Sequence, residues 1–364
     1  MSSTALRDFV SRTRRFRFGL CLAAASAVVF TAGPLAADRD HYNQKGNILI
    51  SDQFNNRVIE ITPKGEIVWH FGLGPNDVTA RSPIGVNDAQ RVGADTLVAG
   101  TGAPPGSEPR CPMGCLDNRV MLVDRSGRID WQYGKFGVSG DGPNELNTPV
   151  QATWLPSGHV LITDQANQRV IEVTHEKKIV WQYGENGVTG IGPNQLNNPN
   201  SAELLSCGDI LIADENNNRA IEVTRAGHIV ATFTAGGTLS GVAFASRLEN
   251  GDTLITDSNN NRVVEVDRHD HIVWQYSTLD PHGNAAPLPT RAIRLENGNT
   301  IISDQFNHRV IIVNHAGHIV ASYGNLNAPG FGTHRTSEGL NAPYDAKVIG
   351  DYTGLTPPFG NDFD

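Results

Sequence analysis

One short block of sequence recurs six times in this chain of 364 residues. One of the six copies, which runs from Asp95 to Gly134, is interrupted by an insert. Because a single unit of this size cannot bury its apolar faces alone, a repeat of fixed period predicts that neighbouring units pack against one another. The complete copy at Gly158 reads GHVLITDQANQRVIEVTHEKKIVWQYG, and the other uninterrupted copies begin at Gly46, Gly208, Gly251 and Gly298.

Each copy predicts three β-strands joined by tight turns. The segment LITD is a short apolar run, as expected of a strand covered on both faces, and RVIEV and KIVWQYG follow after polar or glycine-containing turns. A fourth expected strand, introduced by a proline in most copies, precedes these three, as in residues 147–158, 197–208 and 288–298. Four antiparallel strands in a repeat of roughly 40–50 residues form a propeller blade. The sequence therefore predicts an all-β fold, a six-bladed β-propeller.

The first copy lacks its opening strand. Only a short polar segment precedes Gly46, whereas residues 341–352 read NAPYDAKVIGDY and match the opening strand NTPVQATWLPSG of a later copy. We expect this C-terminal strand to complete the first blade, because joining the two ends of the ring removes two exposed sheet edges. This interpretation places one propeller domain at residues 38–354 and a short tail at residues 355–364.

Residues 1–37 have the layout of a secretory signal peptide. Four arginines precede an apolar run from Phe18 to Phe30, and Ala36 and Ala37 offer a small-residue cleavage site. The run is short for a membrane span and polar sequence follows it, so we expect cleavage and export to the periplasm or the exterior. Both the general secretory route and the twin-arginine route are compatible with this segment.

The charge of the remaining chain argues against several classes of partner. Without residues 1–37, which contain five Arg and one Asp, 24 basic and 37 acidic residues remain, a formal net charge of −13. Such an acidic excess disfavours nucleic acids and anionic membrane surfaces and favours a soluble, self-repelling monomer. No later apolar segment is long enough to span a membrane.

Two of the four cysteines lie close together in the insert of the second copy. In an oxidising exported compartment, Cys111 and Cys115 of the segment CPMGC are expected to form a small disulfide loop. A metal site there would need further ligands, and no His or third Cys lies near in sequence. Cys207 is left single in a tight turn, and we expect it to be an inert thiol.

The repeat resembles a known family. A proline, a strand, a glycine, a strand, the motif Asp-x-x-Asn-x-Arg-Val and two further strands follow the layout of the NHL repeat, and the segments GPNELNTP and GPNQLNNP resemble its inter-blade connection. The resemblance covers about residues 46–352 and implies a six-bladed propeller. NHL-type propellers include binding scaffolds, amidating lyases and other lyases, so the resemblance is specific for fold rather than activity.

Resemblance to propeller enzymes is weaker. The strand ending IVWQYG is similar to that of arylsulfotransferase-type bacterial propellers, and apolar strands with Trp also occur in quinoprotein-type propellers. The resemblance to amidating lyases and arylsulfotransferases implies functional histidines in or near the central channel. No histidine of this chain falls in an expected innermost strand, which argues against both chemistries.

The motif Asp-x-x-Asn-x-Arg is expected to have a structural role. Asp and Asn close tight turns by bonding nearby backbone amides, and the Arg can pair with the Asp. Equivalent copies spaced around a ring cannot converge on one calcium site. The five copies begin at Asp52, Asp164, Asp214, Asp257 and Asp304.

Loop lengths direct attention to one face of the expected ring. The turns between first and second strands, and between third and fourth strands, are tight, and both kinds are expected on the same face of the ring. The opposite face, which we call the long-loop face, carries the inter-blade connections and the insert from Thr101 to Leu116; long loops on a rigid scaffold commonly hold binding residues. Phe54 and Phe306 emerge there in identical DQFN turns, either as an exposed contact patch or tucked under neighbouring loops.

The innermost strands begin at the long-loop face and differ from blade to blade, unlike the repeated motif. This variation predicts a single asymmetric site at the channel mouth. Arg291 with Gln151 and Asn200 could bind an anionic or sugar-like group, whereas Asp88 and Asp345 could hold a divalent cation such as calcium. Internal salt bridges are the alternative role for these charges. The predicted channel-mouth set is Asn87, Asp88, Gln151, Asn200, Arg291, Tyr344 and Asp345.

These observations predict an exported binding scaffold that takes a small molecule or a protein at its long-loop face. The alternative is a propeller enzyme, a lyase or hydrolase or, further from the pattern, a sulfotransferase, using a metal or an Arg/Tyr pair at the channel mouth. The sequence contains no nucleophile–His–Asp set, phosphate loop or metal-spaced His cluster that favours a particular reaction.

Overall fold

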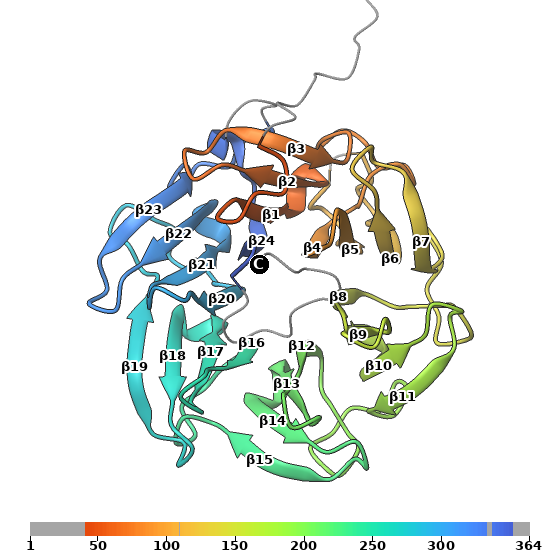
Figure 1. Cartoon of the computed structure of the whole chain (residues 1–364), viewed down its shortest axis with the longest axis vertical. Helices are drawn as coiled ribbons and strands as arrows, with labels where there is room; N and C mark the ends of the chain where they lie inside the picture. Colours follow the sequence, from red (N-terminus) through yellow and green to blue (C-terminus); the bar gives the residue numbers. More distant parts are fainter. Residues whose placement is uncertain (1–40, 109, 333–336, 352–364) are drawn as a thin grey trace, which may run out of the picture. The chain divides into compact units, whose positions relative to one another are not determined.

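The computed structural model describes residues 41–108, 110–332 and 337–351, all within one compact unit, Ala37–Asp364. The expected signal peptide and the C-terminal tail lie outside the described residues. The described chain forms six four-stranded antiparallel sheets placed around an axis like the blades of a propeller (Figure 1). The predicted fold class is therefore confirmed. Among the described residues, no helix has the length and apolar character needed to cross a membrane.

We number the blades 1–6 along the chain and name the innermost strand of each first. Blade 1 contains β24 (Pro343–Val348), β1 (Ile48–Asp52), β2 (Arg57–Ile61) and β3 (Ile67–Phe71). Blade 2 contains β4 (Val86–Val92), β5 (Asp95–Ala103), β6 (Cys115–Val123) and β7 (Ile129–Gly134). Blade 3 contains β8 (Pro149–Trp154), β9 (Val160–Asp164), β10 (Arg169–Val173) and β11 (Ile179–Tyr183).

The remaining blades repeat this meander, in which strands adjacent in sequence are adjacent in the sheet. Blade 4 contains β12 (Pro199–Leu204), β13 (Ile210–Asp214), β14 (Arg219–Val223) and β15 (Ile229–Phe233). Blade 5 contains β16 (Val242–Arg247), β17 (Thr253–Asp257), β18 (Arg262–Val266) and β19 (Ile272–Ser277). Blade 6 contains β20 (Arg291–Arg294), β21 (Thr300–Asp304), β22 (Arg309–Val313) and β23 (Ile319–Gly324).

Blade 1 is assembled from both ends of the described chain. Strand β24 pairs antiparallel with β1 along its whole length, from Ile48 opposite Val348 to Asp52 opposite Pro343. The backbone bonds continue one residue further, where Ile349 donates to the carbonyl of Asn47 at 2.8 Å. The expectation that a C-terminal strand completes the first blade is confirmed, and it leaves no blade with an unpaired inner strand.

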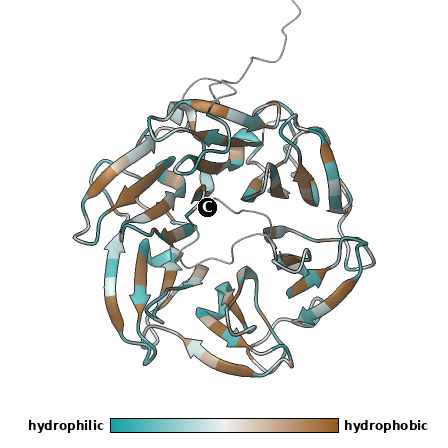
Figure 2. Ribbon diagram, in the orientation of Figure 1, coloured by the Kyte–Doolittle hydropathy of each residue, from teal (hydrophilic) through white to brown (hydrophobic). Residues whose placement is uncertain are grey.

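The apolar core is divided among the six spaces between neighbouring blades. Successive residues of one strand point into the spaces on opposite sides of the blade: Ile48 and Ile50 pack against blade 6, whereas Leu49 packs against blade 2. Because both faces of each sheet are covered in this way, the second strands of blades 1, 3, 4, 5 and 6 are buried at every position, and apolar residues form their middle (Figure 2). The same arrangement explains why one isolated repeat could not fold alone.

The repeated Asp-x-x-Asn-x-Arg motif builds the turn between second and third strands. In blade 3, Asp164 Oδ2 accepts hydrogen bonds from Asn167 Nδ2 and Arg169 Nε, both at 2.7 Å, while its Oδ1 accepts the backbone N–H of Asn147. Gln168, at the end of the short 3-10 turn, adopts a left-handed φ of 58°. Equivalent bonds occur in blades 1, 4, 5 and 6, which confirms the structural role expected for the motif.

Tryptophans of the outermost strands connect four of the six blades to the next, namely blades 1, 2, 3 and 5. Each indole N–H donates to a backbone carbonyl in the tight turn between third and fourth strands of another blade. His175 and His315, which lie in two of these turns, also stack on the indole rings they bind. The pairs are Trp69 with Arg125, Trp131 with His175, Trp181 with Arg225, and Trp274 with His315, at 2.8–3.0 Å.

The insert of blade 2 is partly a β-hairpin rather than a loop. Strands β5 and β6 each have nine residues and pair as far as Ala103 opposite Cys115. The hairpin extends from the long-loop face because it continues from the end of the second strand. The predicted disulfide between Cys111 and Cys115 is confirmed and closes the end of the insert. Glu108 of the insert accepts a hydrogen bond from Asn56 Nδ2 of blade 1 at 3.3 Å.

Candidate functional site

The innermost strands place six side chains, one from each blade, at one level around the channel. In each blade an alanine of the innermost strand pairs with the middle of the second strand, for example Ala89 with Val98 and Ala292 with Ile302. The residue before this alanine varies, and we call these six residues the axial layer. Four of them belong to the predicted channel-mouth set. The axial layer consists of Asp345, Asp88, Gln151, Ser201, Phe244 and Arg291.

Four members of the axial layer bind the backbone of the next blade. Each accepts a hydrogen bond from the N–H of the alanine that follows the layer there, so polar side chains act as inter-blade connections. These residues are buried, with exposures of 4% or less. The bonds are Asp345 to Ala89 at 3.3 Å, Asp88 to Ala152 at 3.2 Å, Gln151 to Ala202 at 2.6 Å, and Ser201 to Ala245 at 3.2 Å.

Arg291 and Lys347 neutralise the two aspartates of the axial layer. Arg291 lies 3.4 Å from Asp88 and 3.4 Å from Asp345, and Lys347 Nζ contacts Asp88 at 2.7 Å and also Asp345. The Arg291 guanidinium also stacks on the ring of Phe244, with Cζ 4.6 Å from the ring centroid. Burial raises the pKa of Asp345, and the nearby Lys347 charge opposes that shift. The two positive and two negative charges form a balanced buried cluster.

The two carboxylates predicted to bind a cation already have positively charged partners in this cluster. Asp88 and Asp345, the candidate calcium ligands predicted from the sequence, are each within ion-pair distance of both Arg291 and Lys347. Two positive groups therefore already occupy the positions around these carboxylates. A divalent cation would have to displace them, at a large electrostatic cost in a buried site.

Asn200 and Tyr344 meet across the ring. They belong to blades 4 and 1, which lie opposite each other, and the Tyr344 hydroxyl is 3.0 Å from Asn200 Nδ2. Both side chains are buried, and burial together with the charge of Glu215 raises the pKa of Tyr344 to about 12. Glu215 in turn accepts a hydrogen bond from Asn200 at 2.9 Å. This contact spans the ring between residues that directly precede the axial-layer residues Ser201 and Asp345.

A chain of amides lies beside this contact. Gln305 donates to Gln53 at 2.8 Å, and Gln53 donates to Asn87 at 2.8 Å, so blades 6, 1 and 2 are connected through side chains of their turns and strands. Asn87 completes the predicted channel-mouth set. All seven predicted residues thus lie on the innermost strands, where they bind one another, neighbouring side chains or the backbone and have exposures of 8% or less.

Several residues of this site are absent from the predicted set. Lys347 and Phe244 lie on innermost strands at positions that vary between blades, which is the same signal that identified Asp88. Gln53 and Gln305 lie in DQFN turns, where the repeated motif conceals their contact with the channel. Sequence variation on the innermost strands can therefore find part of the set, but the repeat hides the rest.

Glu203 is a buried acid with no balancing charge in the axial layer. It lies on β12, and its carboxylate accepts the backbone N–H of Arg247 at 3.1 Å. Burial raises its pKa from 4.5 to about 8. The folded protein therefore holds this proton to about pH 8, whereas the unfolded chain releases it near pH 4.5.

We expect Glu203→Gln to remove part of the pH dependence of stability. Because the native state binds the extra proton, the Glu203 contribution to stability is fully present below about pH 4.5 and is lost as pH rises to about 8. The free energy of unfolding of the wild type should fall by up to about 1 kcal/mol per pH unit across this window. Urea unfolding between pH 4.5 and 9 measures the slope. Glu249→Gln, at an exposed turn position of blade 5, is the control and should keep the wild-type slope; an identical slope in Glu203→Gln would contradict the assignment.

The rim of the long-loop face combines half-buried and exposed apolar residues. Phe54 and Phe306, predicted as rim contacts, are half-buried, and their backbone N–H groups bond to Asn341 and Pro287 of the neighbouring connections. Larger exposures occur further along the loops, where Phe331 is 86% exposed. The large apolar side chains exposed on the loops and the insert of this face are Leu73, Met113, Leu116, Val138, Ile191, Leu279 and Phe331.

Comparison with known proteins supports the architecture and leaves the activity open. No family model matches the chain, and no curated protein matches it. A solved structure of a protein of unknown function from Bacteroides caccae is similar at 14% identity, with 77% of this chain and 93% of that chain covered and a TM-score of 0.51. Virginiamycin B lyase from Staphylococcus aureus aligns at 15% identity over 77% of this chain and 85% of its own, with a TM-score of 0.48. The likeness to the Bacteroides caccae structure shows a shared fold and nothing about a reaction.

Proposed function

We propose that this protein is an exported, monomeric NHL-type propeller of residues 38–354 that binds a partner protein through its long-loop face. The observation that carries the proposal is the exposure of large apolar side chains on this face, up to 86% for Phe331, 85% for Met113 and 70% for Ile191. Large apolar side chains exposed among polar loop residues are typical of interaction surfaces. The acidic excess of the chain disfavours nucleic acid as the partner.

The distribution of these residues favours a protein over a small molecule. They lie on five of the six inter-blade connections and on the hairpin insert, so a ligand that touched most of them would have to cover the whole face. The channel-mouth residues below them bind one another and would form the floor of the interface. A rigid scaffold that presents several anchor residues on loops is a common arrangement for protein recognition.

A second candidate is a small anionic ligand in the channel mouth, including the substrate of a lyase or hydrolase. The observation in its favour is Arg291, which is fully buried: within the described part of the chain its Nη1 has no hydrogen-bond partner, and its Nε has only the 3.4 Å ion-pair contact with Asp345. An anion that displaced Asp88 from this guanidinium could use those donors. Such a ligand would first have to separate Asn200 from Tyr344.

The double substitution Ile191→Ser with Phe331→Ser should weaken partner binding without unfolding the protein. Both side chains are exposed, so little core packing is lost, whereas two apolar anchors of the interface disappear. We expect a loss of affinity of about 100-fold, the effect of roughly 2–3 kcal/mol from two anchors. The measurement is affinity capture from the exported fraction of the source cells, followed by titration of the captured protein.

Exposed apolar residues elsewhere on the molecule provide the control. Val230 on β15 and Val320 on β23 are 55% and 54% exposed on the outermost strands, away from the long loops. Val230→Ser with Val320→Ser should capture the partner as the wild type does. If the control loses binding and the loop variant retains it, the long-loop face is the wrong surface. If the loop variant binds normally and a folded Asp88→Ala variant does not, the channel-mouth candidate is favoured.

A further inference from the structure

The tight-turn face, opposite the long loops, repeats one ionic contact between neighbouring blades. A glutamate on the third strand receives an arginine from the following blade, which ties the two sheets together. The contact occurs in four blades and uses one carboxylate oxygen of each glutamate. The pairs are Glu60 with Arg91, Glu172 with Arg225, Glu222 with Arg247, and Glu265 with Arg294.

In three of these blades, a nitrogen from the first turn of the same blade binds the second carboxylate oxygen. In blade 5 this is Asn250 Nδ2, which also donates to Asp252 at 2.9 Å, so that one amide connects two carboxylates. Both oxygens of each glutamate are thus matched by nitrogen groups. The three contacts are Asn47 Nδ2 to Glu60 at 2.6 Å, His159 Nδ1 to Glu172 at 2.7 Å, and Asn250 Nδ2 to Glu265 at 3.4 Å.

Blade 4 keeps the carboxylates and lacks the amide. Its first turn has the same backbone bonds as that of blade 5, and Cys207 stands where blade 5 has Asn250, with Asp209 in place of Asp252. Arg247 still donates to Glu222 Oε2 at 2.8 Å. Within the described residues, no donor is bonded to the other oxygen of Glu222 or to the Asp209 carboxylate. Two carboxylates therefore face each other beside a thiol, without the group that separates them in blade 5.

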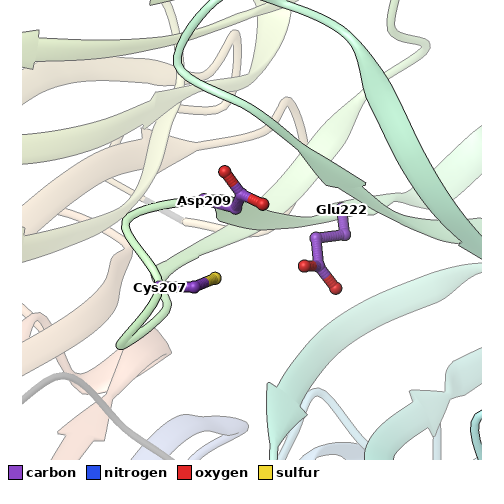
Figure 3. Close-up of side chains that lie close together, drawn as sticks. All are labelled: Cys207, Asp209 and Glu222. Atoms are coloured by element: carbon purple, nitrogen blue, oxygen red, sulfur yellow. The ribbon is translucent and has the colours of Figure 1, made fainter.

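The ligand atoms of these three residues converge. The Cys207 sulfur and one carboxylate oxygen each from Asp209 and Glu222 all lie within 4.8 Å of one another. Figure 3 shows the three side chains gathered between the turn and strand β14. Around a tetrahedral zinc ion, ligand atoms are about 3–4 Å apart, because metal–ligand distances are about 2.0–2.3 Å. A side-chain adjustment of about 1 Å would close the set, with no change in the sheet.

We propose that Cys207, Asp209 and Glu222 bind one Zn²⁺ ion on the tight-turn face. A divalent cation replaces the amide that relieves carboxylate repulsion in blade 5, and a thiolate favours zinc over calcium or magnesium, which take oxygen ligands. The three residues leave one coordination position of a tetrahedral ion open, on the exposed side where Cys207 meets solvent. The thiol expected to be inert from the sequence thereby becomes a metal ligand.

Two single substitutions exchange the donor sets of blades 4 and 5. Cys207→Asn introduces into blade 4 the amide that bridges carboxylates in blade 5, so it should fold normally and lose the metal. Asn250→Cys places a thiol beside Asp252 and Glu265 and should create a second site. The full chain, made without a polyhistidine tag and stripped with chelator, is titrated with Zn²⁺ and, separately, with Co²⁺, whose thiolate complex gives a charge-transfer absorption band.

We expect one bound zinc per wild-type chain, none for Cys207→Asn and two for Asn250→Cys. Binding should weaken as pH is lowered, because all three ligands must be deprotonated. Circular dichroism verifies that both variants keep the sheet structure. Failure of the wild type to take up zinc, or an unchanged zinc content in Cys207→Asn, overturns the proposal, and a missing second equivalent in Asn250→Cys overturns the claim that this donor set suffices. These readouts concern the face opposite the long loops and are independent of the partner-binding test.

Discussion

Removal of residues 341–364 is expected to abolish the cooperative unfolding transition of the propeller. The deletion removes β24, which pairs with β1 along its whole length, so the inner edge of blade 1 would be exposed. It also removes Tyr344, Asp345 and Lys347, which hold the channel contacts of blades 2, 4 and 6. Losses of this size exceed the roughly 5–15 kcal/mol by which domains are stable. Thermal unfolding followed by circular dichroism should show no sigmoidal transition.

Two further chains separate ring closure from simple shortening. A chain ending at Asp351 keeps all the described strands and should unfold like the full protein. A permuted chain that carries residues 341–350 directly before Lys45 should regain the transition, because Ile349 and Gly46 are already joined by a 2.9 Å backbone bond. Their turn would then match the one that joins β8 and β9 in blade 3. A truncated chain that unfolds as cooperatively as the wild type would show that β24 does not close the ring.

Arg291→Ala should be among the most destabilising single substitutions in the protein. It removes the buried charge that faces Asp88 and Asp345 and leaves Lys347 as their remaining charged partner within the described cluster. Breaking a buried ion pair from one side costs about 3–5 kcal/mol, because the surviving charge stays desolvated. The loss should be larger at pH 8 than at pH 5, since burial raises the pKa of Asp345 and protonation of that carboxyl relieves its repulsion with Asp88. Urea unfolding at both pH values measures the effect.

An exposed arginine serves as the control for the Arg291 substitution. Arg128 forms ion pairs with Asp124 and Asp130, but its side chain is 71% exposed, so Arg128→Ala should leave the urea midpoint unchanged. Adding Asp88→Ala to Arg291→Ala restores the charge balance and should recover part of the lost stability. A destabilisation of Arg291→Ala no larger than that of Arg128→Ala would mean that the axial cluster does not hold the blades together.

Much of the architecture could be predicted because the repeat encodes it locally. Apolar runs such as LITD indicate strands with two covered faces, and the motif beginning at Asp164 predicts the turn that its hydrogen bonds form. The match between residues 341–352 and an opening strand identified the closure of blade 1. The extension of β5 and β6 into the insert was not predictable, because its glycine- and proline-rich sequence has no alternating pattern.

For the candidate sites, the sequence could indicate which residues lie near the channel but not which side chains contact one another. Variation on the innermost strands selected residues that lie on those strands around the axis, yet it did not indicate that Arg291 meets Asp88, which lies 203 positions away. Nor did it indicate that Asn200 reaches Tyr344 across the ring. The carboxylates beside Cys207 were also missed, because Glu222 belongs to a repeated strand and only the paired sheet places it near the turn.

The sequence by itself therefore determined the number of blades, the strand that closes the ring and the face that carries the long loops, since these depend on period, turn chemistry and loop length. The tertiary structure decided that the channel charges neutralise one another, that apolar loop residues remain exposed, and that a thiol lies within 4.8 Å of two carboxylates. The reason is that a repeat specifies contacts within each blade and with its neighbours. Which exceptional side chains meet across the axis or across a turn depends on the closed ring and on the side-chain conformations that it allows.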